Sequence, residues 1–79
     1  MTSDTGATLD VRELPPRERH SLIFARLDGL KAGESLQLIN DHDPKPLYYQ
    51  LQAERPDQFD WQPEEEGPEA WKIRITRRK

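Results

Sequence analysis

The period of the hydrophobic positions changes along the chain, and each change predicts the boundary of an element. Residues 8–11 alternate polar and apolar side chains, which is typical of a short strand whose Leu9 and Val11 face inward. Between residues 16 and 31 the apolar positions recur every three or four residues, which is the spacing of one helix face. The stripe on this face consists of His20, Ile23, Phe24, Leu27 and Leu30.

Prolines and a glycine mark where the helices begin and end. Pro16 suits the first turn of the first helix, because an N–H at that position has no partner within a helix. Gly33 can adopt the left-handed conformation that closes many helices, so we expect it to end this one. A second helix is predicted over residues 44–55, with Asp43 as its N-cap and Pro44 as its first residue.

Three further segments alternate with a period of two, so the chain is predicted to contain four strands. The additional strands are residues 35–39, 59–62 and 70–76. The first two strands are joined by a helix and should therefore be parallel, with a right-handed crossover. The last two are joined by a polar, acidic turn and should form a hairpin.

These elements predict an α/β (α+β) two-layer sandwich of order βαβαββ, with two helices on one face of a four-stranded mixed sheet. A single domain is expected over residues 8–79, since the chain is too short for a second one. Residues 1–7 are small and polar and are expected to form a disordered tail.

The loops that follow the two parallel strands should lie at the same end of the sheet. Residues 12–20 should therefore face residues 40–45, with both helix N-termini directed into the gap between them. Both histidines of the chain, His20 and His42, fall in this region. We name it the His20/His42 corner, and it is the predicted functional site.

Composition excludes several classes of protein. The chain has no cysteine, so it has no disulfide, no thiolate metal ligand and no thiol nucleophile. Its first residues lack the basic and apolar regions of a signal peptide, and no apolar run approaches the length of a membrane span. We therefore expect a soluble, cytoplasmic protein. The net charge of −3 argues against nucleic acid as a partner, although small four-stranded sheets do bind RNA.

The chain resembles the TusA/SirA family of small sulfur-carrier proteins, which share the βαβαββ order. The segments that carry this resemblance are residues 9–14, residues 30–36 and Asn40-Asp41-His42-Asp43-Pro44. Those carriers place a Cys-Pro-x-Pro motif at the start of the first helix, where this chain has Pro16-Arg17-Glu18-Arg19. The resemblance therefore supports the fold, whereas the missing thiol argues against sulfur relay.

The chain resembles still more closely an uncharacterised bacterial family of domains of unknown function that is allied to these carriers. The matching positions include Asp10-Val11-Arg12, Pro15-Pro16, Arg19-His20, Gly33-Glu34, Asn40-Asp41-His42-Asp43-Pro44, Tyr48-Tyr49, Trp61 and Trp71. Members of that family occur beside, or fused to, hemerythrin-like and cupin domains in respiratory nitrogen-oxide metabolism. The resemblance implies a redox or hemerythrin-like protein partner and no settled activity.

One hypothesis for the corner is a metal site. His20 and His42 offer imidazoles, and Asp41 and Asp43 offer carboxylates, a donor set that suits a divalent metal such as Zn²⁺ or Fe²⁺. The structural alternative is that His20 packs half-buried on its helix, while Asp43 caps the second helix and His42 steadies the loop. The spacing of these residues does not decide between the two.

A second hypothesis is a site for an anion or a small ligand. Helix N-termini favour negative charge, and Arg12, Arg17, Arg19 and Lys45 surround the predicted gap. The alternative is an internal salt bridge, in which Arg12 or Arg19 pairs with Asp41.

A third hypothesis is a protein-interaction adaptor. Its surface would be the corner together with Tyr49, which lies off the buried stripe of the second helix. The expected alternative roles of the other aromatic residues are packing ones, with Tyr48 in the core and Trp61 and Trp71 against each other or the first helix. Catalysis is the weakest hypothesis, because neither Ser21 nor any other side chain is recognisable as an activated nucleophile.

The sequence therefore predicts a non-catalytic accessory or binding domain in redox or nitrogen-oxide-related metabolism, with a ligand or metal site at the His20/His42 corner. The first alternative is an adaptor whose corner is only structural. Further alternatives are a sulfur-relay relative that lost its cysteine and an RNA-binding module.

Overall fold

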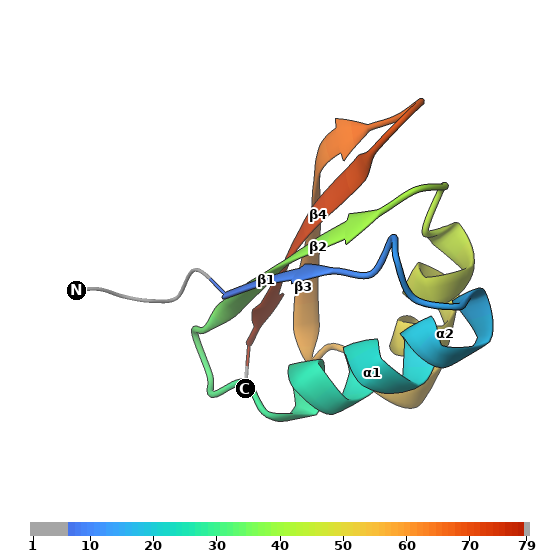
Figure 1. Cartoon of the computed structure of the whole chain (residues 1–79). Coiled ribbons are helices and arrows are strands. Elements are labelled where there is room, and N and C mark those ends of the chain that lie inside the picture. The colour runs from blue at the N-terminus through green and yellow to red at the C-terminus, as the bar shows by residue number, and fades with distance from the viewer. Residues whose placement is uncertain (1–6, 79) are drawn as a thin grey trace.

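The chain folds into four strands and two helices in the predicted order (Figure 1). The structure, a computed structural model, describes residues 7–78. The elements are β1 (Ala7–Asp10), α1 (Pro16–Asp28), β2 (Ser35–Asn40), α2 (Lys45–Glu54), β3 (Phe59–Glu66) and β4 (Trp71–Arg77). The fold class predicted from the sequence is confirmed.

The four strands form one mixed sheet in the order β1-β2-β4-β3. β1 pairs parallel with β2, which places Leu9 opposite Leu38, and β4 pairs antiparallel with both β2 and β3. The parallel pair and the hairpin are therefore confirmed. Since β2 and β4 occupy the centre, β1 and β3 are the two edges of the sheet.

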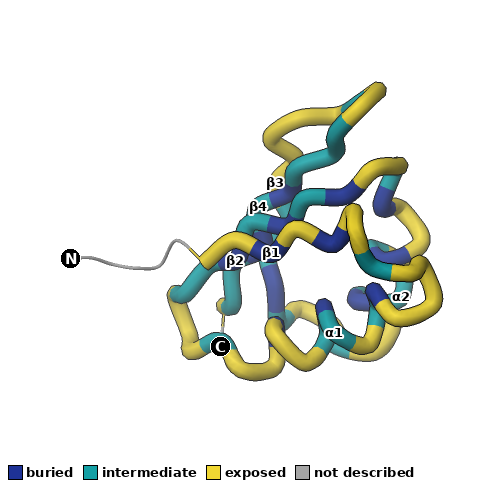
Figure 2. The backbone as a smooth tube through the Cα atoms, viewed as in Figure 1, coloured by how far each residue is buried: buried dark blue, intermediate teal, exposed yellow. Residues whose placement is uncertain are grey.

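Both helices lie against the same face of this sheet, and the core fills the space between the two layers (Figures 1 and 2). Alternation along the central strands and three-to-four spacing along the helices direct the apolar side chains into this space. The core consists of Leu9, Val11, Ile23, Leu27, Leu36, Leu38, Leu47, Leu51, Phe59, Ile73 and Ile75. Full burial of a large side chain of this kind contributes about 1.5–3 kcal/mol.

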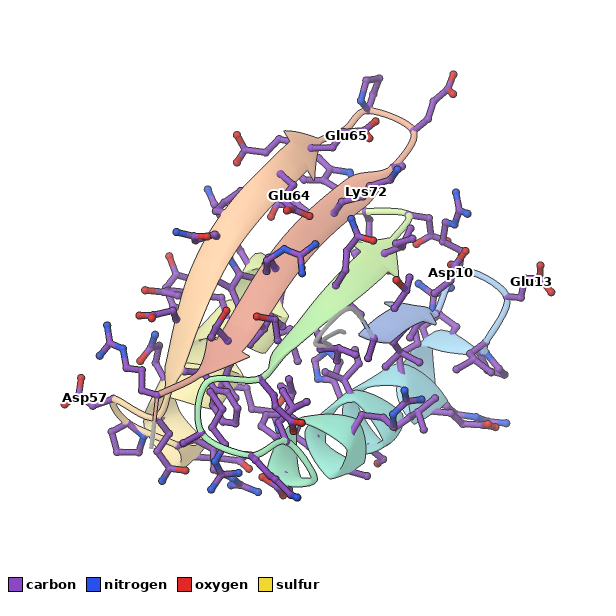
Figure 3. All side chains as sticks on the ribbon, turned by 90° about the vertical axis from the view of Figure 1, so that its left-hand side faces the viewer. Asp10, Glu13, Asp57, Glu64, Glu65 and Lys72 are labelled. Atoms are coloured by element: carbon purple, nitrogen blue, oxygen red, sulfur yellow. The ribbon has the colours of Figure 1, made fainter. Side chains whose placement is uncertain are left out.

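The opposite face of the sheet is polar and is held by charged and amide side chains. Glu64 accepts hydrogen bonds from Gln37 and from Arg74, each at 3.0 Å. Lys72 lies 3.7 Å from the carboxylate of Glu65, and Figure 3 shows Glu64, Glu65 and Lys72 together near the end of the hairpin. On this face Lys72 and Arg74 of β4 are thus paired with carboxylates of β3. The aromatic residues of the described strands all lie on the helix-covered face, so this open face offers no aromatic platform for stacking RNA bases.

The end of α1 and the start of α2 differ from those predicted. α1 ends at Asp28, three residues early, and Gly29 closes it with an N–H that points to the Arg26 carbonyl. Gly33 does take a positive φ of 90°, but in the turn before β2, where its N–H donates to the Arg77 carbonyl at 2.7 Å. Helix propensity is low at glycine, which explains the earlier stop at Gly29.

The start of α2 is shifted by one residue. The helix begins at Lys45, and Pro44 rather than Asp43 occupies the N-cap position. Asp43 nevertheless acts as a local cap, because its Oδ1 accepts the Lys45 N–H at 3.1 Å. None of the helices in residues 7–78 is long and apolar enough to cross a membrane.

The strand β3 is twice as long as predicted, because it continues through Pro63 to Glu66. Pro63 lies on an edge strand, where a missing N–H costs no ladder hydrogen bond, and a bulge follows between Pro63 and Glu65. The longer hairpin projects beyond the helices (Figure 1). At the N-terminus, Ala7 belongs to β1 instead of the expected tail, whose residues 1–6 lie outside the described chain.

Candidate functional site

Arg19 is the centre of the His20/His42 corner. It lies on α1 with only 5% of its surface exposed, and all five guanidinium N–H groups have acceptors within the chain. Nε donates to the Leu14 carbonyl at 2.9 Å, and Nη2 donates to the Arg12 carbonyl at 3.1 Å. Nη1 donates at 2.8 Å to both Asn40 Oδ1 and Asp41 Oδ1, and Nη2 also reaches the second carboxylate oxygen of Asp41 at 3.3 Å.

These contacts tie the loop after β1 to the loop after β2. The two loops do face each other as predicted, and the internal salt bridge between Arg19 and Asp41, the alternative to an anion site, is present. Arg19 has no N–H left for a ligand. Its role in the corner is to satisfy buried carbonyl and amide oxygens, each of which would otherwise be costly to leave unpaired.

The carboxyl group of Asp41 is held in its charged form. The hydrogen bonds from Arg19 lower the pKa of Asp41 well below its ordinary value, and the hydrogen bond from His42 lowers it further. An unfolded chain would bind a proton at this carboxyl more readily than the folded one. The stability that Asp41 contributes should therefore be complete above about pH 4, the unfolded pKa, and should be lost as the pH falls from there through the folded pKa.

We expect the variant Asp41→Asn to show a shallower loss of stability in acid than the wild type. The measurement is the urea midpoint at several values between about pH 2 and 5. Some slope should remain in the variant, because the pKa values of Asp10, Asp28 and Glu64 are also lowered by hydrogen bonds from arginines. Equal slopes for the two proteins would contradict the role assigned to Asp41.

The two histidines of the corner have separate partners. His42 is exposed, and its Nδ1 lies 2.8 Å from Asp41 Oδ1. His20 is half-buried between the helices, and its Nδ1 lies 2.8 Å from Gln50 Oε1 on α2. In residues 7–78 no three His, Cys, Asp or Glu side chains are grouped to hold a metal ion. The metal hypothesis for His20, His42, Asp41 and Asp43 stays a prediction, which Zn²⁺ titration followed by imidazole NMR would test.

The helix N-termini at the corner present few free N–H donors. α1 begins with Pro16, and the Glu18 N–H already points to the Pro15 carbonyl at 2.9 Å. In α2, Asp43 takes the Lys45 N–H, and Pro46 at the next position has none.

The other cations predicted at the corner differ in whether they already have a partner. Arg12 holds Asp10 through two hydrogen bonds of 2.9 and 2.7 Å, so it is engaged. Arg17 and Lys45 are exposed on the first turns of their helices. The corner therefore offers two cations, and few backbone donors, to an anion.

A pocket of about 690 Å³ lies beside this corner, between α2 and the β3–β4 hairpin. Its size falls within the range of small-ligand pockets. The aromatic residues that line it are Tyr48, Tyr49, Phe59, Trp61 and Trp71. The extension of β3 forms this pocket, because the projecting part of the hairpin supplies a wall that the helices do not cover.

The aromatic rings of the pocket are arranged edge to face. Tyr48 contacts Trp61 with ring centroids 5.2 Å apart, and it contacts Tyr49 at 5.6 Å. The packing partner of Trp61 is therefore α2, whereas the sequence predicted Trp71 or the first helix. Tyr49 is 65% exposed and is the one exposed large hydrophobic side chain in residues 7–78.

Charged residues line the same pocket, with carboxylates in excess. The carboxylates are Asp43, Asp60, Glu65 and Glu66, and the cations are Lys45 and Arg78. Arg78 Nε donates to Asp60 at 2.6 Å, and Glu65 lies near Lys72. Within the described chain no ion pair involves Glu66, so its carboxylate stays available to a partner's cation.

Of the residues predicted to form the site, Asp43, Lys45 and Tyr49 line this pocket. The histidines, Asp41 and the three arginines do not. Sequence reasoning treated Trp61 and Trp71 only as packing residues. The sequence signal for a shared surface is the alternation of the two hairpin strands, which places both tryptophans on the same face of the sheet.

A scan against protein-family models matches residues 8–77 to the family described as "Uncharacterized conserved protein (DUF2249)". No curated protein matches the chain, and no solved structure matches it either. The resemblance to a family of domains of unknown function is thus confirmed, while kinship with the TusA/SirA carriers stays a prediction. The match covers nearly the whole chain, so this protein belongs to the DUF2249 family.

Proposed function

We propose that this chain is a non-catalytic binding domain that recognises a partner protein through the aromatic pocket between α2 and the β3–β4 hairpin. The observation that carries the proposal is the exposed ring of Tyr49 at the rim of a pocket of about 690 Å³. Tyrosine and tryptophan are enriched among the residues that contribute most binding energy at protein interfaces.

The corner supports this pocket structurally. Arg19 joins the two loops, and the loop after β2 leads directly into α2, which carries both tyrosines. The hydrogen bonds of Arg19 hold the loop before α2 and so help to position Tyr48 and Tyr49 relative to Trp61. Affinity benefits from such a preformed surface, because fewer side chains must be ordered on binding.

Redox proteins are the partner class that the resemblance to domains found beside hemerythrin-like proteins suggests. The proposed role is that of an adaptor in a redox or nitrogen-oxide-related pathway. A direct catalytic role receives little support from Ser35, because its hydroxyl lies 2.9 Å from the Thr76 hydroxyl, which is not a base.

Selection from a displayed library of random decapeptides tests the proposed function without a named partner protein. We expect peptides that bind the wild-type chain and lose at least about tenfold in affinity to Tyr49→Ala, as for an interface hot spot. Amide NMR should place the bound peptides against α2 and β3. Because Tyr49 is exposed, its truncation should change stability by no more than about 0.5 kcal/mol.

Arg26→Ala is the matched control, since Arg26 is exposed on α1 and lies outside the pocket. This variant should bind the selected peptides as the wild type does. A selection that yields no peptide sensitive to Tyr49→Ala would overturn the proposed function.

A further inference from the structure

The free edge of β3 runs along the aromatic pocket. Phe59, Trp61 and Pro63, at every second position of this strand, all line the pocket. Tyr48 and Tyr49 of α2 line the same pocket, and the Tyr48 ring contacts Trp61. An exposed strand edge beside a pocket is where proteins add an extended peptide to a sheet, because the backbone pairs with the edge and alternate side chains enter the pocket.

We propose that an extended, basic segment of a partner protein adds to the edge of β3 as a fifth strand and inserts a cationic side chain among the aromatic rings of the pocket. This inference rests on the proposed function and specifies how the partner binds. The proposed occupant is a peptide segment. Binding of a small organic cation alone is a different outcome, and the experiment distinguishes the two.

The pairing of β3 with β4 shows which backbone groups are free. The Arg78 N–H donates to the Gln58 carbonyl at 2.8 Å. In an antiparallel pair the residues that bond to the neighbour alternate with residues whose N–H and C=O point away. Asp60 therefore bonds to β4, whereas Phe59 and Trp61 direct their N–H and C=O groups to the open edge.

Pro63 falls on the outward-pointing set as well. Its missing N–H would have pointed to the edge, so proline at this position leaves the ladder with β4 intact and offers a partner only a carbonyl. The bulge and the glutamates that follow protect the rest of the edge from pairing. The stretch that can accept a new strand is thus limited to residues 59–63, which is the stretch that borders the pocket.

The charges of the pocket select a basic segment. Four carboxylates line it against two cations, and the pair between Arg78 and Asp60 takes one of each. Lys45 then stands against Asp43, Glu66 and Glu65, of which Glu65 lies near Lys72. Glu66 stands opposite Trp71 across the hairpin, so a guanidinium placed over the indole could also meet this carboxylate. The chain itself contains this kind of contact, with Arg55 over the ring of Phe24 and Arg77 over the ring of Phe59, which is one of the pocket residues.

Synthetic octapeptides of alternating arginine and threonine are the probe, titrated into the isotopically labelled wild-type chain. Two further peptides carry N-methyl groups, one on every arginine amide and one on every threonine amide. In an extended strand these two sets point to opposite sides, so only one set can pair with β3. We expect one methylated peptide to lose at least about tenfold in affinity and the other to bind as the parent does.

Measurements on the protein itself should locate the bound peptide at the same strand edge. Binding should slow the hydrogen exchange of the Phe59 and Trp61 amides, because these are the donors left free at the edge. The variant Glu66→Lys should weaken the arginine peptide about tenfold and favour a peptide of alternating glutamate and threonine. Glu69→Lys, at an exposed turn position outside the pocket, is the matched control and should leave both affinities unchanged.

Three results would overturn strand addition. Both methylated peptides could bind like the parent, protection could appear at the amides of β1 instead of β3, or free N-acetylarginine amide could bind as tightly as the octapeptide. If the library peptides still depend on Tyr49 in any of these cases, the proposed function stands and only the mode of binding is wrong. If neither library peptides nor arginine peptides bind, both fail.

Discussion

Replacing Arg19 with methionine should lower the free energy of unfolding by about 3 kcal/mol, a large share of the stability of a domain of this size. Methionine fills a similar volume but donates no hydrogen bond. The change leaves the carbonyls of Arg12 and Leu14 without this donor, and it leaves Asp41 without its arginine partner. The amide oxygen of Asn40 also loses the arginine and keeps only the Asp41 N–H. Urea unfolding followed by circular dichroism measures the effect.

Arg17→Met is the matched control, because Arg17 lies on the same helix turn but is exposed and forms no ion pair within the described chain. It should change the free energy of unfolding by no more than about 0.5 kcal/mol. Arg19→Lys should recover only part of the loss, since an ammonium group cannot reach acceptors on both loops as the planar guanidinium does. If Arg19→Met were as stable as Arg17→Met, the hydrogen bonds of the corner would contribute nothing and its structural role would be wrong.

Gly67→Ala should lower the free energy of unfolding by about 2–4 kcal/mol, through two effects that act together. Gly67 has a φ of 72°, a conformation that L-residues with a Cβ rarely adopt. A Cβ at this position would also lie 2.7 Å from the indole ring of Trp71, so the ring would have to move. Because Trp71 lines the pocket, its fluorescence should shift and peptide binding should weaken in the same variant.

Gly33→Ala separates the two effects. Its φ of 90° carries a similar conformational cost, but nothing lies within 4 Å of the added Cβ. This control should lose about 1–2 kcal/mol and keep the tryptophan fluorescence of the wild type. Equal losses in the two variants would show that the Trp71 indole yields to the new methyl group at no cost.

The sequence predicted one functional site, but the structure has two separate regions, a corner that stabilises the fold and a pocket that is open to a partner. The corner contains the densest hydrogen bonding around a buried side chain in the described chain, and its groups satisfy one another. The pocket has the exposed ring, an edge with free backbone groups, and a carboxylate that no ion pair in residues 7–78 engages. Polar groups that are already paired stabilise a fold, whereas recognition requires groups that a partner can still satisfy.

The sequence by itself determined the element order, the parallel pair, the hairpin and most of the core. These properties follow from local patterns: alternation predicts strands, three-to-four spacing predicts helices, and proline or glycine marks their ends. The facing of the two corner loops could also be predicted, because it follows from the connection of two parallel strands through a helix. Even the pairing of Arg19 with Asp41 was among the alternatives that the residues allowed.

Only the tertiary structure decided which of those alternatives was present and where the open surface lies. The guanidinium of Arg19 meets Asn40 across 21 residues of sequence, and no local pattern reports whether its donors are used up. The pocket depends on β3 continuing past Pro63, a residue that normally argues against a strand and is tolerated here because β3 is at the edge. Edge position is a property of the whole sheet, so the residues beside it acquire a binding surface that only the assembled fold reveals.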